Sequence, residues 1–306
     1  MAGWYLPIYK TIRSSNTLRS VARGLRYAMP DIKVTAQVDY LGPFQFRLKR
    51  HHWLWGKQAL RGHARGLAMF ERIIEPDGVF YDVGLNIGYY ARFIASHFAV
   101  SKVVGFEPMT QNIDLARRNI ELCPRPNLIS LHEIALGDTD GEELLQVDDI
   151  TDGSAVLDRV SGGEPAEGRQ NAGLPGMTEA VRMLKLDTFV AEGSEPAPTA
   201  MKIDTEGAEV MVLEGATETL AKHSPHLVIA THGVEPAIGT FNLLTEHGYR
   251  LFGWARDPAV KGGRYRQLTL ADLSQLADNN LMASKDLGLL EAPIDPLDMS
   301  NLSLRG

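Results

Sequence analysis

Acidic side chains follow three apolar, strand-like runs of this sequence. Asp82 lies near the end of VFYDV, Glu107 ends KVVGFE, and Asp204 ends AMKID with Glu206 two residues later. In an open α/β sheet the carboxyl ends of the strands line the ligand site, so we expect these acids to gather at one edge of a sheet. Carboxylates placed together bind a cation, an amine or hydroxyl groups, and they repel a pyrophosphate.

The turn after Asp82 carries Gly84, Asn86 and Gly88 ahead of an amphipathic run that predicts a helix. Gly84 allows a sharp turn and a close approach of ligand to backbone, and Gly88 permits close contact between helix and strand. The turn differs from the dinucleotide pattern Gly-x-Gly-x-x-Gly in both spacing and charge. Glu107 lies at the separation from Gly84 that is typical of an acid accepting protons from ribose hydroxyls.

His232 and Asp204 are the candidate catalytic bases. His232 follows the run HLVIAT, and imidazole titrates near neutral pH, which suits a residue that takes a proton from a hydroxyl acceptor. Asp204 and Glu206 can instead position the acceptor or bind Mg²⁺ or Ca²⁺ through oxygen. We assign no metal ligands, and the single cysteine, Cys123, excludes a Cys-rich zinc site.

Strands that alternate with helices must position these residues. Between residues 76 and 290 the pattern predicts an α/β domain with a mostly parallel sheet covered on both faces. The predicted strands are 79–83, 102–107, 127–136, 200–204, 226–231, 249–254 and 280–284, and the predicted helices include 60–74, 110–122, 207–221 and 238–247. Residues 150–180 are rich in Gly, Pro, Asp and Glu and predict a long surface loop that helps to shape an acceptor pocket.

The ends of the chain are predicted to lie outside this domain. Residues 1–75 predict a basic extension containing a helix and a β-hairpin within 33–50, and residues 291–306 predict a tail. Residues 1–72 carry thirteen basic and three acidic side chains, a net charge of +10, against −17 for the remainder. This asymmetry favours contact with an anionic surface or with the acidic body of the protein itself.

The chain of 306 residues is 44% hydrophobic, which indicates a folded globular protein. No run reaches the roughly 18 apolar residues of a membrane-spanning helix, and the first residues do not form a secretory signal. We therefore expect a cytoplasmic protein, with peripheral contact at the inner membrane through the basic N-terminal region as an alternative.

Taken together, the motifs resemble the FkbM family of S-adenosylmethionine-dependent methyltransferases over about residues 76–250. The matching segments are DVGLNIGYY at 82–90, GFEP at 105–108, KIDTEGAE at 202–209 and VLEGA at 212–216. The resemblance implies a Rossmann-like class I fold with a seven-stranded sheet and one antiparallel strand near its end. Two positions depart from the family pattern, Leu85 in the first turn and Thr231 after a later strand.

The resemblance also implies how the cofactor S-adenosylmethionine is held. Its expected contacts are Asp82, Gly84, Asn86 and Gly88 around the methionine portion, Glu107 on the ribose, Leu136 and Asp138 against the adenine, and Asp204 near the sulfonium. The implied reaction is methylation of a hydroxyl on a sugar, glycolipid or natural product.

Two other functions fit the same fold. A nicotinamide-dependent oxidoreductase would share Glu107 but needs the glycine turn that this chain lacks. A non-catalytic protein would keep the fold and use the basic N-terminal region to bind a membrane or a partner. We expect a small-molecule, saccharide or lipid acceptor and no nucleic acid partner.

Overall fold

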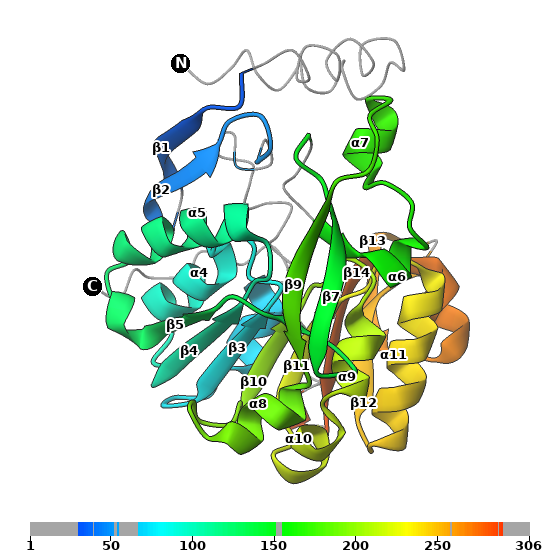
Figure 1. Cartoon of the computed structure of the whole chain (residues 1–306). Helices are drawn as coiled ribbons and strands as arrows, with labels where there is room; N and C mark the ends of the chain where they lie inside the picture. The colour runs from blue at the N-terminus through cyan, green and yellow to red at the C-terminus, as the bar shows by residue number, and fades with distance from the viewer. Residues whose placement is uncertain are drawn as a thin grey trace.

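The computed structural model describes residues 30–38, 40–51, 54, 67–150, 155–257, 259–286 and 288–289. The predicted helix before residue 30, residues 60–66 of the predicted helix 60–74 and the tail 291–306 lie outside these ranges, and residues 67–73 are helical. Within them, an eight-stranded sheet runs through the centre with helices on both sides (Figure 1). Its strands are β3 (Val79–Val83), β4 (Lys102–Phe106), β5 (Ile129–His132), β10 (Ala200–Ile203), β11 (His226–Ala230), β12 (Arg250–Asp257), β13 (Val260–Gln267) and β14 (Leu276–Ser284).

The strand order is β13-β12-β14-β11-β10-β3-β4-β5. The five strands from β11 to β5 are parallel, and β14 pairs antiparallel with both β11 and β12. The Rossmann-like class I architecture is therefore confirmed, but the expected number of seven strands is wrong. The eighth strand, β13, forms a hairpin with β12. Its sequence VKGGRYRQ carries two glycines and three basic residues, so it lacks the apolar pattern of a strand.

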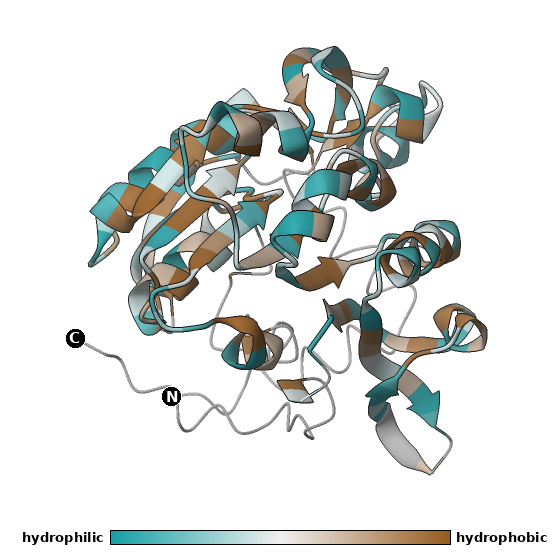
Figure 2. Cartoon of the chain, turned by 90° about the horizontal axis from the view of Figure 1, so that it is seen from below, coloured by the Kyte–Doolittle hydropathy of each residue, from teal (hydrophilic) through white to brown (hydrophobic). Residues whose placement is uncertain are grey.

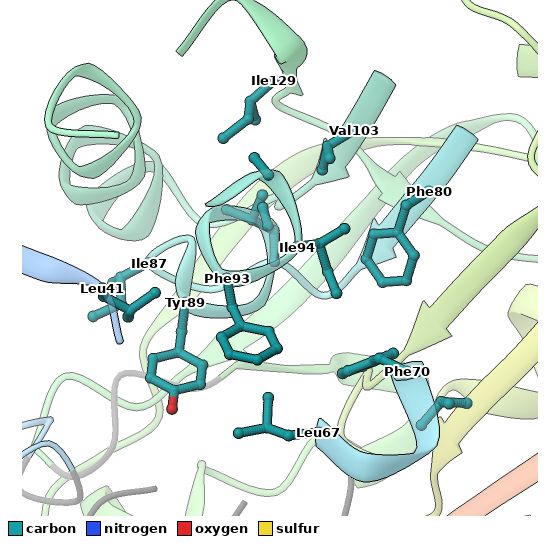
Figure 3. Close-up of a cluster of buried hydrophobic side chains, with 14 of the residues drawn as sticks. Leu41, Leu67, Phe70, Phe80, Ile87, Tyr89, Phe93, Ile94, Val103 and Ile129 are labelled. Carbon is teal, nitrogen blue, oxygen red and sulfur yellow. The ribbon is translucent and has the colours of Figure 1, made fainter. Parts of the chain in front are cut away.

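Alternate residues of the strands serve two separate cores. Phe80 and Val103 face a cluster that includes Phe93 and Ile94 on α4, as Figure 3 shows. Their neighbours Tyr81 and Val104 belong to a second cluster on the opposite face. Figure 2 shows brown, hydrophobic stretches along the strands and helices banded in brown and teal. This burial on both faces explains why the central strands read as continuous apolar runs.

Helices cover each face of the sheet. The first face packs against α4 (Tyr89–His97) and α5 (Thr110–Glu121), and residues of α8, α9, α10 and α11 belong to the second cluster. The bounds are α8 (Leu186–Glu192), α9 (Glu209–Glu214), α10 (Thr217–Lys222) and α11 (Val234–Glu246), with 3-10 turns η2 (Pro126–Leu128) and η3 (Leu270–Gln275). The predicted single helix 207–221 is thus two helices. They part at Gly215, where a Cβ would lie 1.9 Å from the Gly137 carbonyl oxygen.

The predicted β-hairpin near the N-terminus is confirmed as β1 (Lys33–Val38) paired antiparallel with β2 (Gly42–Arg47). Arg92 of α4 is fully buried and donates hydrogen bonds to the carbonyl oxygens of Leu41 and Pro43. The Asn119 amide of α5 bonds both the N–H and the carbonyl of Gln45. These bonds fasten the hairpin to the two helices that pack on the first face of the sheet.

The predicted long loop 150–180 is wrong, because this segment contributes to a second, four-stranded sheet of order β6-β9-β7-β8. Its elements are β6 (Ala135–Leu136), β7 (Gly141–Val147), β8 (Ala155–Leu157), α6 (Asp158–Ser161), α7 (Glu167–Asn171) and β9 (Thr178–Leu184). The predicted strand 127–136 is accordingly divided between β5 in the central sheet and β6 in the second sheet. Elements of three to five residues separated by Gly and Pro are too short to show a periodicity.

Candidate active site

A cavity opens at the carboxyl ends of β3, β4 and β10, where the strand order reverses. It is lined by Val83, Gly84, Asn86, Phe106, Glu107, Pro108, Asn112, Ile134, Ala135, Leu136, Leu145, Ala155, Leu157, Asp204, Thr205, Glu206 and Ala208. The charged members of this lining are all acids, and no Lys, Arg or His of the described ranges belongs to it. The lining therefore suits a cationic ligand with an apolar portion.

The first turn is built by close backbone contacts. Gly84 has φ 78°, and a Cβ there would lie 1.9 Å from the carbonyl oxygen of Asp204, so the turn presses against the loop after β10. Asn86 has φ 54°, a left-handed conformation that Asn tolerates. Its side-chain oxygen accepts the N–H of Ile87 at 2.8 Å, which fixes the turn. Leu85 is buried in the first core and does not line the cavity.

Glu107 is held at the cavity wall by two backbone groups. The N–H of Asn86 donates to Oε2 at 2.8 Å, and the N–H of Met109 donates to Oε1 at 3.0 Å. Burial raises the pKa of Glu107 to about 7, although these hydrogen bonds favour the carboxylate. A carboxylate fixed in this way keeps lone pairs that hydroxyl groups of a ligand can reach.

Asp204 is paired with a buried lysine. Lys202 Nζ lies 3.1 Å from Asp204 Oδ2, 3.6 Å from Asp82 Oδ1 and 4.6 Å from the centre of the Tyr90 ring. Asp82 is fully buried and does not line the cavity, and its burial raises its pKa to about 6 against the opposing effect of Lys202. The structure therefore places Asp82 beside Lys202 in the interior, outside the cavity lining.

Lys202 is a residue that sequence reasoning did not single out, although the signal was available. A lysine inside a buried central strand is rare unless it has a carboxylate partner. The composition AMKID on a predicted strand between two apolar neighbours therefore indicates a buried ion pair, and Asp82 and Asp204 are the nearest acids in the predicted sheet.

The three predicted catalytic residues lie together. His232 Nε2 is 3.4 Å from Glu206 Oε2 and 3.6 Å from Asp204 Oδ1. Its Nδ1 is 2.8 Å from Oε1 of Glu209, a fully buried residue that sequence reasoning did not assign. Burial lowers the pKa of His232, but the hydrogen bond to Glu209 and the charges of all three carboxylates outweigh it and raise the pKa to about 9. His232 is thus protonated at neutral pH in the absence of a ligand, and it lies just outside the cavity lining.

Of the remaining residues predicted to bind the cofactor, one lines the cavity and two do not. Leu136 lines the cavity beside Ile134. Asp138 does not line it and is paired instead with Arg159 of α6, whose guanidinium hydrogen-bonds both carboxylate oxygens. Gly88 caps the start of α4 and also lies outside the lining.

Part of the cavity wall comes from the second sheet. Leu145 of β7 and Ala155 and Leu157 of β8 form an apolar side of the cavity. Sequence reasoning missed these residues, because the last two fall inside the segment that was predicted as a loop.

The described part of the chain shows neither a metal cluster nor a membrane-spanning helix. Within it, no group of three His, Cys, Asp or Glu side chains is arranged to hold a metal ion. No helix in these ranges combines the length and the apolar character needed to cross a membrane.

Known proteins with similar sequences are methyltransferases or contain a related segment. Residues 82–251 match the model of the methyltransferase FkbM domain. The chain is 26% identical to the hexuronic acid methyltransferase AglP of Haloferax volcanii, with 63% of this chain and 72% of AglP aligned. It is 25% identical to the AMB antimetabolite synthetase AmbE of Pseudomonas aeruginosa, with 58% of this chain but 10% of AmbE aligned.

Among solved structures, a methyltransferase FkbM from Methylobacillus flagellatus KT is similar to this chain with a TM-score of 0.43 at 15% identity. The similarity covers 88% of this chain and 60% of that one.

Proposed function

The chain belongs to the FkbM methyltransferase family, and from this premise we propose that it transfers the methyl group of S-adenosylmethionine to a hydroxyl oxygen of a sugar-containing acceptor. The charge of the cavity carries the proposal. Its lining includes Glu107, Asp204 and Glu206, with no basic side chain from the described residues. Such a lining attracts a sulfonium and an ammonium group, and it repels the pyrophosphate of a nicotinamide dinucleotide.

The residues present fit this cofactor. Glu107 would accept hydrogen bonds from the ribose hydroxyls, and Ile134 and Leu136 would contact the adenine. Gly84 and Asn86 of the first turn line the cavity and would contact the methionine portion. Asp204, between Glu206 and the first turn, would face the sulfonium. When bound, the cofactor supplies an electrophilic methyl carbon, and the protein must align the acceptor oxygen with it.

His232 would accept the proton of the acceptor hydroxyl. Its imidazole is held by Glu209 on one side and lies against Asp204 and Glu206 on the other. A sulfonium beside Asp204 adds a positive charge, which lowers the pKa of His232 from about 9 and favours the neutral imidazole. Asp204 is the alternative acceptor of this proton.

The choice of a sugar acceptor is supported by the name of AglP, a hexuronic acid methyltransferase that shares 26% identity with this chain. A glycolipid or another hydroxyl-bearing natural product would meet the same chemistry. The apolar side of the cavity, formed by Leu145, Ala155 and Leu157, suits an acceptor with an apolar portion.

Calorimetry with S-adenosylmethionine, S-adenosylhomocysteine and NAD tests the cofactor. We expect both sulfur compounds to bind and NAD not to bind; binding of NAD with neither sulfur compound would refute the proposal. Transfer of a labelled methyl group to a fractionated extract of the source cell then tests the reaction. A labelled product that keeps its methyl group in mild alkali indicates an ether, as a hydroxyl acceptor requires, whereas release of labelled methanol indicates an ester.

A further inference from the structure

Five charged side chains form a row of alternating sign beside the cavity, and its central member, Asp204, belongs to the cavity lining. The row is Asp82, Lys202, Asp204, His232 and Glu209. Lys202 Nζ lies 3.6 Å from Asp82 and 3.1 Å from Asp204 Oδ2. His232 continues the row, with Nε2 at 3.6 Å from Asp204 Oδ1 and Nδ1 at 2.8 Å from Glu209. The two oxygens of Asp204 therefore face two different cations.

Three members of this row are buried, and the other two are partly exposed. Asp82 and Glu209 are both 0% exposed and Lys202 is 4% exposed, whereas the side chains of Asp204 and His232 are 31% and 27% exposed. Glu209 also accepts the backbone N–H of Gly207 at 2.9 Å. Buried charges of this kind stay in place through their partners and through packing, so the two ends of the row anchor its centre.

Asp204 needs the cation on its inner side. Asp204 and Glu206 both lie near Nε2 of His232, and the Asp82 carboxylate lies on the other side of Lys202 from Asp204. Without the ammonium group, the carboxylates would repel one another, and Asp204 would take up a proton or turn away.

We propose that Lys202 is a positioning residue for methyl transfer, which holds the Asp204 carboxylate ionised and directed at the cavity and at His232. The proposal rests on the function given above, because it assigns Lys202 a role in that reaction. A purely structural role, in which Lys202 serves to neutralise the buried Asp82, would be separable from it by experiment.

Two variants separate these roles. Lys202→Met removes the ammonium group and keeps most of the side-chain volume, but it leaves Asp82 buried without its cation. Lys202→Met combined with Asp82→Asn removes both charges. We expect the single variant to melt at a lower temperature and the double variant to recover much of this loss. Neither should recover turnover, measured as transfer of labelled methyl to cell extract, which we expect to fall at least tenfold.

Titration of His232 by NMR provides a readout that does not depend on turnover. With Lys202 gone, Asp204 takes up a proton or turns away, so His232 loses the charge of one of its three carboxylates and its pKa should fall in both variants. The titration is followed at the resonance that is absent in His232→Ala. Recovery of turnover together with the melting temperature in the double variant, or an unchanged or raised pKa of His232, would overturn the proposal.

The same measurements separate this proposal from the proposed function. Failure of the wild-type protein to bind S-adenosylmethionine removes the function and this inference together. A wild-type protein that binds the cofactor and transfers the methyl group, beside variants that do so equally well, removes the inference alone.

Discussion

Replacement of Glu107 by Gln should weaken cofactor binding by about 30-fold. Each carboxylate oxygen of Glu107 accepts one backbone N–H, from Asn86 and from Met109. A glutamine offers one oxygen and one NH₂ group, so it loses the charge and one acceptor position. Hydrogen bonds to charged groups contribute roughly 1.5–3 kcal/mol, against about 0.5–1.5 kcal/mol for neutral ones. A loss of about 2 kcal/mol over the two ribose hydroxyls corresponds to the 30-fold increase in Kd.

The assay is titration calorimetry with S-adenosylmethionine and S-adenosylhomocysteine. Both should lose affinity equally, because the two ligands share the ribose. Glu107→Gln should also destabilise the protein by roughly 1–3 kcal/mol, since one buried backbone N–H then faces another donor. Glu133→Gln is the matched control, because Glu133 is exposed, pairs with Arg117 and does not line the cavity. A Kd for Glu107→Gln within threefold of wild type would refute this placement of the ribose.

The same residue predicts a pH dependence. Because the pKa of Glu107 is raised to about 7, the free protein holds a proton there in mild acid, whereas ribose binding requires the carboxylate. Cofactor affinity should therefore fall by up to about tenfold per pH unit below 7 and level off above it. The raised pKa also means that the folded protein holds this proton more tightly than the unfolded chain. The resulting contribution to the free energy of unfolding is present at acid pH and is lost as the pH rises through 7. Calorimetry from pH 5.5 to 8.5 checks the binding, and Glu107→Gln should remove this dependence.

Three further substitutions test the site. Asp204→Asn should weaken the binding of S-adenosylmethionine about tenfold and that of S-adenosylhomocysteine less than threefold, because S-adenosylhomocysteine has no sulfonium charge for Asp204 to attract. Equal losses in calorimetry would contradict this placement. His232→Ala should bind the cofactor but slow labelled methyl transfer at least tenfold, and wild-type turnover would return the base role to Asp204 or to water. Gly84→Ala should lower the melting temperature far more than Gly162→Ala, because both positions have positive φ but Gly84 alone would clash, with a Cβ 1.9 Å from the Asp204 carbonyl oxygen; similar losses would contradict the close packing of this turn.

The central strands could be predicted from the sequence because they are buried on both faces. Strands β3, β4, β10 and β11 read as short apolar runs, and the acids at the ends of β4 and β10 predict that Glu107 and Asp204 lie at one edge of the sheet, where both line the cavity. The edge strand β13 could not be predicted, because a strand at the exposed edge of a sheet does not need a run of apolar residues.

Contacts between segments that are far apart in the sequence could not be predicted either. Asp82 and Asp138 were both expected at the cofactor, yet neither lines the cavity, because Lys202 and Arg159 pair with them. The pairing of Asp138 with Arg159 leaves no local pattern, whereas the lysine within the strand AMKID does indicate an ion pair. The second sheet was missed for a related reason: β8 and β9 both pair with β7, which lies outside the segment predicted as a loop.

The position of His232 has a consequence for the balance of charge during the reaction. Methyl transfer removes one positive charge from the sulfur, and in the proposed reaction His232 gains one when it accepts the proton of the hydroxyl. The imidazole lies against three carboxylates, those of Asp204, Glu206 and Glu209, and Asp204 would also face the sulfonium of the cofactor. The total charge near these acids would therefore be the same before and after turnover. The site would exchange one cation for another, and its surroundings would have little to rearrange between substrate and product.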